Sequence, residues 1–204
     1  RSVEALIRWN HPTKGIISPE EFLPLAETNK FIIQIGNWAL KQACKIGSSW
    51  NKEYNLNIKI SVNVSAVQLK EVDFSKSVSS IIAEQKYSSH LLELEVTETS
   101  ILDNVKLSTE QLSELKRLGI SIALDDFGSG YSSLIHLKQI PATSLKIDRS
   151  FISNITSDDQ NVFIVDIMAN IAEKFKLELI AEGVETEEQL NYLKQYDDII
   201  IQGF

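Results

Sequence analysis

The chain has 204 residues, of which 43% are hydrophobic and 24% are charged, and its net charge is −8. This composition is typical of one globular domain with a sizeable core, and the acidic balance argues against DNA or RNA as a partner. The longest apolar runs are a few residues, as at 199–201, whereas a membrane helix needs about 20. The single cysteine, Cys44, cannot form an internal disulfide and fits a cytoplasmic location.

Seven short apolar segments predict β-strands, and segments with helical periodicity separate them. In chain order the predicted strands are 2–9, 58–64, 91–97, 120–125, 144–148, 177–182 and 199–202. Alternation of strands and helices predicts a parallel sheet.

The first predicted helix opens with Ser18-Pro19-Glu20-Glu21, which has the pattern of an N-cap, a proline at the first helical position and a capping-box glutamate. A second helix follows, on which Trp38 and Trp50 are predicted to lie in the core. Further helices are predicted over 74–85, 105–118 and 162–175.

The alternation within each strand predicts which kind of parallel sheet this is. In 58–64, Ile60, Val62 and Val64 share one phase, while the opposite phase is polar. The strands over 91–97, 120–125 and 144–148 show a related split. An open sheet buried on both faces would carry continuous apolar runs. The pattern therefore predicts an α/β, TIM-barrel-like (β/α) barrel with a polar interior. Seven strands are one fewer than the usual eight, so we expect one domain over 1–204 that is incomplete at both ends.

Side chains of the kind that bind metal ions stand where these strands end. They are Glu4, Asn63, Glu95, Asp125, Asp126, Glu182 and Gln202. Because all strand C-termini of a parallel barrel open on one face, we expect these residues to meet in one cluster. Oxygen ligands of this type suit Mg²⁺ or Mn²⁺.

Each motif also has a plainer interpretation when it is taken alone. The pair Asp125-Asp126 could cap a turn. Glu98 and Glu185 could be acids in the first turn of a helix. Lys146, on the interior phase of its strand, could pair with an acid, or could orient an attacking water near a metal.

Taken together, the motifs resemble the EAL family of cyclic di-GMP phosphodiesterases. Seven strings match the family pattern in order: Glu4-Ala5-Leu6-Ile7-Arg8-Trp9, Ser61-Val62-Asn63-Val64-Ser65, Glu95-Val96-Thr97-Glu98, Asp125-Asp126-Phe127-Gly128, Leu145-Lys146-Ile147-Asp148, Ala181-Glu182-Gly183-Val184-Glu185 and Gln202-Gly203. Ser129 stands where the family more often has threonine. The resemblance also implies one antiparallel strand near the start of the barrel.

The resemblance implies a role for each matched residue. Glu4, Asn63, Glu95 and Asp125 would hold one cation, and Asp125 and Asp126 a second, so that Mg²⁺ or Mn²⁺ is present as two ions per site. Lys146 and Glu182 would position the attacking water, and loss of Glu4 would abolish catalysis with the metal. Arg8 would contact a substrate phosphate, and Gln202 the metal-site water or its neighbours. Supporting roles fall to Glu98, which would hold the loop after Asp126, to Asp148 beside Lys146, and to Glu185 near the second metal.

The function implied is hydrolysis of cyclic di-GMP to linear pGpG. Two alternatives stay open: a binding module that senses the dinucleotide without cleaving it, and a metal-dependent barrel that acts on another phosphoester. We also expect a homodimer, fusion to sensory or GGDEF domains in the full-length protein, and a cytoplasmic domain with a membrane tether, if any, outside this chain.

Overall fold

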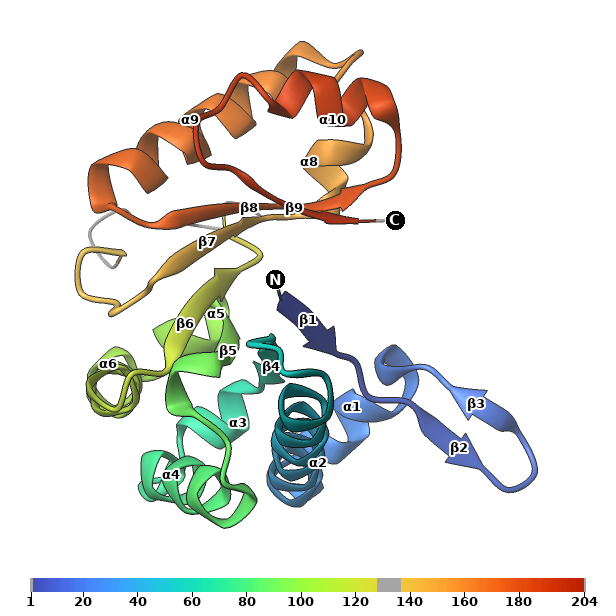
Figure 1. Ribbon diagram of the computed structural model, residues 1–204, viewed down its shortest axis with the longest axis vertical. Coiled ribbons are helices and arrows are strands. Elements are labelled where there is room, and N and C mark those ends of the chain that lie inside the picture. The colour runs from blue at the N-terminus through green and yellow to red at the C-terminus, as the bar shows by residue number, and fades with distance from the viewer. Residues whose placement is uncertain (1, 128–136, 204) are drawn as a thin grey trace. The chain divides into compact units, whose positions relative to one another are not determined.

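The computed structural model describes residues 2–127 and 137–203 (Figure 1). The chain divides into two compact units, an N-terminal unit Arg1–Ser121 and a C-terminal unit Ile122–Phe204. Each unit alternates strands with helices and builds a parallel sheet.

In the N-terminal unit the sheet contains β1 (Ser2–Ala5), β4 (Lys59–Val64) and β5 (Leu92–Thr97), in that order. β1 and β5 both pair with β4 in parallel. The helices of this unit are α1 (Pro19–Thr28), α2 (Phe31–Tyr54), α3 (Ala66–Leu69), α4 (Phe74–Gln85), the 3-10 helix η1 (Ser89–Leu91), α5 (Glu98–Leu102) and α6 (Val105–Arg117).

An antiparallel hairpin of β2 (Trp9–His11) and β3 (Gly15–Ile17) follows β1 and projects from this unit in Figure 1. The first predicted strand, 2–9, is therefore too long, because β1 ends at Ala5 and Trp9 already belongs to the hairpin. Gly15, at φ 75°, allows the chain to reverse after the turn. The resemblance implied one antiparallel strand near the start of the barrel; the antiparallel pair observed near the start forms a two-stranded sheet of its own.

The C-terminal unit contains the four remaining strands of the prediction, all parallel to their neighbours. They are β6 (Ser121–Asp125), β7 (Ser144–Ile147), β8 (Glu178–Val184) and β9 (Ile200–Gly203). The described helices are α8 (Arg149–Ser153), α9 (Asp159–Phe175) and α10 (Glu187–Leu193).

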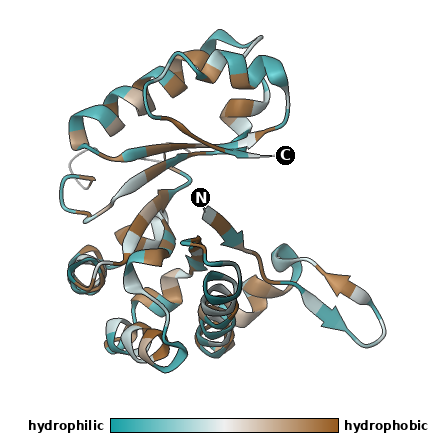
Figure 2. Cartoon of the chain, viewed as in Figure 1, coloured by the Kyte–Doolittle hydropathy of each residue, from teal (hydrophilic) through white to brown (hydrophobic). Residues whose placement is uncertain are grey.

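The predicted two phases of each strand are present in both units. Ile60, Val62 and Val64 are buried, as are the apolar residues of β5 and β7. The opposite phase is polar: Glu95 and Lys146 are buried, whereas Asn63 is exposed. Figure 2 shows the corresponding two-faced helices, with brown and teal segments alternating along α9.

Two local predictions are wrong. Ser18 is the N-cap of α1 and Pro19 its first residue, but the Ser18 side chain makes no capping hydrogen bond. Trp38 and Trp50 lie outside the core, with 56% and 40% of their surface exposed. Helix α2 instead buries Leu40, Ala43, Cys44 and Gly47. Trp38 lies on the opposite side of the helix, whereas Trp50 continues the buried stripe at the end of the helix and is still exposed. Among the described residues, none of the helices is both long and apolar enough to cross a membrane.

Candidate active site

In the N-terminal unit, three predicted ligands lie on adjacent parallel strands. The register aligns Asn63 of β4 with Glu95 of β5, and Glu4 of β1 with Ser61 of β4. The Asn63 Nδ2 donates a hydrogen bond of 2.7 Å to Glu4 Oε1. One carboxylate oxygen of Glu4 and one of Glu95 lie within 4.8 Å of each other. The N-terminal unit therefore brings two carboxylates and one amide to the same place, a donor set that suits a hard divalent cation.

A second polar layer lies one step back along the same strands, and the sequence argument missed it. Glu93 precedes Glu95 by two residues on β5 and is only 3% exposed. The Ser61 hydroxyl donates to Glu93 Oε1 at 3.0 Å, and Lys59 Nζ lies 3.5 Å from Glu93 Oε2. The two-residue spacing from Glu95 was the signal that could have found it. These partners compensate the burial of the Glu93 carboxylate.

In the C-terminal unit, Lys146 is the central charged residue. It projects from β7, is only 1% exposed, and forms an ion pair with Glu182 of β8. Its ammonium nitrogen also lies 3.7 Å from Asp125 Oδ2 at the end of β6. Burial of a cation costs free energy unless acidic groups lie beside it, and Glu182 and Asp125 are the two acids beside Lys146.

Asp125 and Asp126 form the predicted pair of adjacent carboxylates. The Asp126 backbone has φ 54°, in the left-handed region, and its N–H donates to Asp125 Oδ1 at 3.0 Å. The pKa of Asp126 is raised, first by burial, then by the negative charges of Asp125 and Asp148, with Lys146 acting in the opposite direction. Clustered carboxylates of this kind are relieved by a bound cation.

The other predicted residues of the C-terminal unit lie on β9, at the start of α8 and directly after β8. Gln202 of β9 is in register with Glu182. Asp148 is the N-cap of α8, and its Oδ1 accepts a hydrogen bond of 2.9 Å from the Ser150 N–H. Glu185 forms an ion pair of 2.7 Å with Arg149, a residue that the sequence argument did not select.

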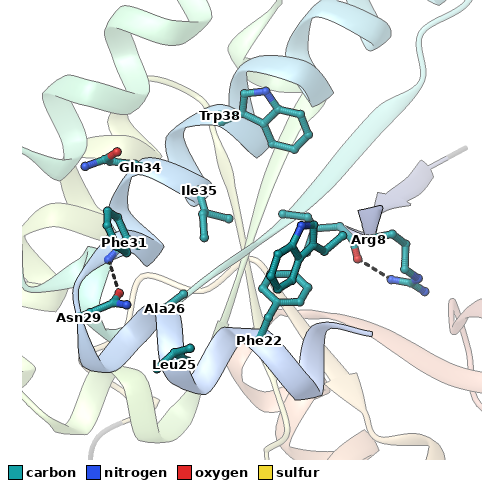
Figure 3. A pocket seen from close by; sticks show the side chains of 11 residues that line it. Arg8, Phe22, Leu25, Ala26, Asn29, Phe31, Gln34, Ile35 and Trp38 are labelled. Atoms are coloured by element: carbon teal, nitrogen blue, oxygen red, sulfur yellow. Dashed lines mark hydrogen bonds between the residues drawn. The ribbon is translucent and has the colours of Figure 1, made fainter. Parts of the chain in front are cut away.

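Arg8 lies at an apolar groove of the N-terminal unit (Figure 3). The groove has a volume of about 520 Å³, and its lining includes Trp9, Phe22, Phe31 and Trp38. The Arg8 guanidinium is exposed and donates to the Ile7 carbonyl at 2.8 Å. Trp9 packs edge-on against Phe22, with ring centroids 5.9 Å apart. Arg8 is therefore an exposed cation of the kind that can bind an anionic group.

Glu98 is the first residue of α5 and is buried. The Thr97 side chain caps this helix by accepting from the Ser100 N–H. The loop that the resemblance assigns to Glu98, with Ser129 in it, falls on 128–136, outside the described residues.

The N-terminal unit brings together Glu4, Asn63 and Glu95, a donor set that fits a divalent metal. The C-terminal unit carries the adjacent carboxylates of Asp125 and Asp126 at the end of β6. All are oxygen donors, which Mg²⁺ and Mn²⁺ prefer.

The EAL domain model matches residues 1–204. Over 203 residues the chain is 41% identical to the bifunctional diguanylate cyclase/cyclic di-GMP phosphodiesterase MucR of Pseudomonas aeruginosa, covering 99% of this chain and 30% of that protein. It is 37% identical over 202 residues to the cyclic di-GMP phosphodiesterase NbdA of the same species, covering 99% of this chain and 26% of that protein. The chain thus spans less than a third of the length of these two relatives.

Among solved structures, a PaMucR phosphodiesterase in complex with c-di-GMP superposes with a TM-score of 0.93 at 40% identity. The match covers 100% of this chain and 82% of that one. The α/β, TIM-barrel-like fold class predicted from the sequence is confirmed by this match.

Proposed function

Because this chain belongs to the EAL domain family, we propose that it hydrolyses cyclic di-GMP to linear pGpG in a reaction that depends on Mg²⁺ or Mn²⁺. The observation that carries the proposal is Lys146, buried and flanked by the carboxylates of Asp125 and Glu182. A sensor has no need of a buried lysine poised among acids. A hydrolase has a use for one, because the attacking water must be held and deprotonated.

Two cations would be held by the strand-end oxygens of the two units. Glu4, Asn63 and Glu95, with Asp125, are proposed for one cation, and Asp125 with Asp126 for the other. When bound, such ions neutralise the phosphate and lower the pKa of a coordinated water. The 2.7 Å contact between Asn63 and Glu4 supports this assignment, because it already orients two of the donors.

Lys146 and Glu182 are proposed as the pair that acts on the attacking water. The Lys146 ammonium can donate a hydrogen bond to the water oxygen, and the Glu182 carboxylate can accept its proton. Their ion pair supports this division of roles, because it fixes the lysine as a donor and the glutamate as an acceptor. Glu4 is included among the catalytic residues because the reaction would fail without its ligand oxygen.

Substrate contacts are proposed for Arg8, on a phosphate, and for Gln202, beside the reacting group. The exposed guanidinium of Arg8 supports the first assignment. The register of Gln202 with Glu182 supports the second. Glu98, Asp148 and Glu185 are proposed as supporting residues.

We also propose how this domain is placed in the full-length protein. The names and lengths of the relatives support fusion of this domain to other domains, of the sensory or GGDEF type. A homodimer and a cytoplasmic position for this domain belong to the same proposal.

The test is incubation of the full-length protein with cyclic di-GMP and Mg²⁺, followed by separation of the products. Appearance of pGpG supports the enzyme. Tight binding with no product would instead support a sensor domain, the second candidate function.

A further inference from the structure

We propose that helix α8 holds the C-terminal ends of β7 and β8 together. We further propose that Arg149 and Glu185, through their ion pair, are positioning residues that keep the Glu182 side chain facing Lys146. The inference rests on the proposed function, since it gives Glu185 a role in water activation that is exerted through Glu182. It is carried by contacts within the C-terminal unit alone.

The first contact joins α8 to the end of β7, the strand that carries Lys146. Asp148 directly follows the last residue of β7, two residues after Lys146, and caps α8 by accepting a hydrogen bond from the Ser150 N–H. The side chain of Ser150 also donates to Asp148 Oδ1. Helix α8 is thereby tied to the end of the strand that carries the lysine.

Helix α8 also contacts the segment that follows Glu182, at two points. At the first turn of α8, Arg149 pairs with Glu185 at 2.7 Å. At its last turn, the Ser153 carbonyl accepts from Gln189 Nε2 at 3.3 Å. The Gln189 Oε1 in turn accepts from the backbone N–H of Glu185 at 2.8 Å and of Thr186 at 3.0 Å.

Strand β8 is irregular directly after Glu182. The pairing with β9 shifts register between Glu182 and Val184, so that Gly183 is an extra residue in the strand. Gly183 has φ 67°, and a Cβ built on it would meet Arg149 Cγ at 2.4 Å. The arginine stem therefore lies directly against the bulge. Bulges of this kind redirect side chains near active sites.

The exposure of the Arg149–Glu185 ion pair sets the loss of turnover that we expect when the pair is removed. The side chains of Arg149 and Glu185 are 61% and 43% exposed, and exposed ion pairs contribute little to stability. Loss of the pair should therefore leave the protein folded. It should release the bulge and lower the fraction of molecules in which Glu182 faces Lys146, with turnover reduced about two- to fivefold.

The experiment is a double-mutant cycle in the full-length protein. Arg149→Met keeps the methylene stem against Gly183 but removes the charge, and Glu185→Gln removes the opposite charge. If the pair acts as a unit, each variant lowers kcat about two- to fivefold with KM unchanged, and the double variant is no worse than either single one. Full turnover in Arg149→Met with a large loss in Glu185→Gln would overturn the proposal, because Glu185 would then act on its own. Additive losses would overturn it as well.

A matched control pair and a second readout separate positioning from general damage. Lys41 and Glu84 form an ion pair of similar exposure, 43% and 55%, in the N-terminal unit. Lys41→Met and Glu84→Gln should leave kcat unchanged. In metal-free protein, amide hydrogen exchange at Glu182–Val184 should quicken in Arg149→Met and stay unchanged in the controls. Unchanged exchange at the bulge would overturn the positioning role of Arg149, whether or not the wild-type protein is active. A wild-type protein without phosphodiesterase activity would count against the proposed function alone.

Discussion

Lys146 Nζ lies 3.7 Å from Asp125 Oδ2, on a side chain that is only 1% exposed. With Glu182 as its second acidic partner, the lysine is a fixed positive charge among carboxylates. The proposed function assigns this lysine to the attacking water and not to a phosphate of the substrate, and the first prediction tests that assignment.

Lys146→Ala should lower turnover of cyclic di-GMP by about 100-fold or more, while binding of the dinucleotide is retained. The reason is that, in the proposed reaction, the ammonium acts on the attacking water and makes no contact that binding requires. Calorimetric titration and steady-state kinetics measure the two quantities separately. Lys174→Ala, at an exposed lysine of α9, is the control and should match wild type. Parallel loss of binding and turnover would mean that Lys146 is a phosphate contact.

Arg8→Ala should show the opposite pattern. An exposed guanidinium that binds a phosphate contributes to affinity, so we expect KM to rise about tenfold or more with a smaller change in kcat. Arg117→Ala, at an exposed arginine in the last turn of α6, is the matched control. A fall in kcat at unchanged KM would assign Arg8 to the chemistry instead.

Mg²⁺ or Mn²⁺ should raise the melting temperature of the wild-type protein, because a ligand that binds only the folded state stabilises it, by about 2.7 kcal/mol at 100 times its Kd. Glu4→Ala should lose most of this shift together with the activity, whereas Glu20→Ala, at an exposed glutamate of α1, should retain both. Thermal melts with chelator and with metal give the comparison. Equal metal shifts in Glu4→Ala and wild type would remove Glu4 from the ligand set.

Gly183→Ala should destabilise the protein more than Gly15→Ala. Both glycines have positive φ, 67° and 75°, so both substitutions incur a backbone strain of about 1–2 kcal/mol. At Gly15 a Cβ would meet nothing within 4 Å, whereas at Gly183 it would collide with Arg149. The difference between the two unfolding free energies, measured in denaturant, isolates that collision. Equal losses would show that Arg149 moves away freely.

The thiol of Cys44 should react slowly with alkylating reagents in the native protein and rapidly in urea. Burial raises the pKa of this thiol from 9.0 to about 12, so little thiolate forms near neutral pH. Because the unfolded chain loses its proton first, stability should fall as pH rises from about 9 to about 12. Alkylation followed by mass spectrometry checks the rate. Rapid labelling of the native protein would show that α2 opens locally.

The sequence predicted the seven parallel strands because their apolar phases recur with period two, as in Ile60, Val62 and Val64. It did not reveal the break after Ala5, since the apolar run continues through Leu6 and Ile7. The short helices α3 and α10 span too few residues for periodicity to appear. Their capping boxes, Ser65 with Gln68 and Thr186 with Gln189, were nonetheless legible in the sequence.

The candidate site was predictable where its residues stand at strand ends, because topology alone brings such positions together within a sheet. Glu4 and Asn63 are an example, 59 residues apart and joined by a hydrogen bond. Arg149 was not predictable, because its partner Glu185 comes within reach only once α8 packs against β8. Trp38 and Trp50 were assigned to the core because they fit helix faces, but they are 56% and 40% exposed.

The most direct test of the account is to measure binding and hydrolysis of cyclic di-GMP together, in full-length wild-type protein and in Glu182→Gln, with Mg²⁺ and with excess chelator. The wild type should form linear pGpG only with Mg²⁺, and Glu182→Gln should bind the dinucleotide but form almost no product. Wild-type protein that binds cyclic di-GMP and leaves it intact in Mg²⁺, or that cleaves it equally well in chelator, would contradict the account.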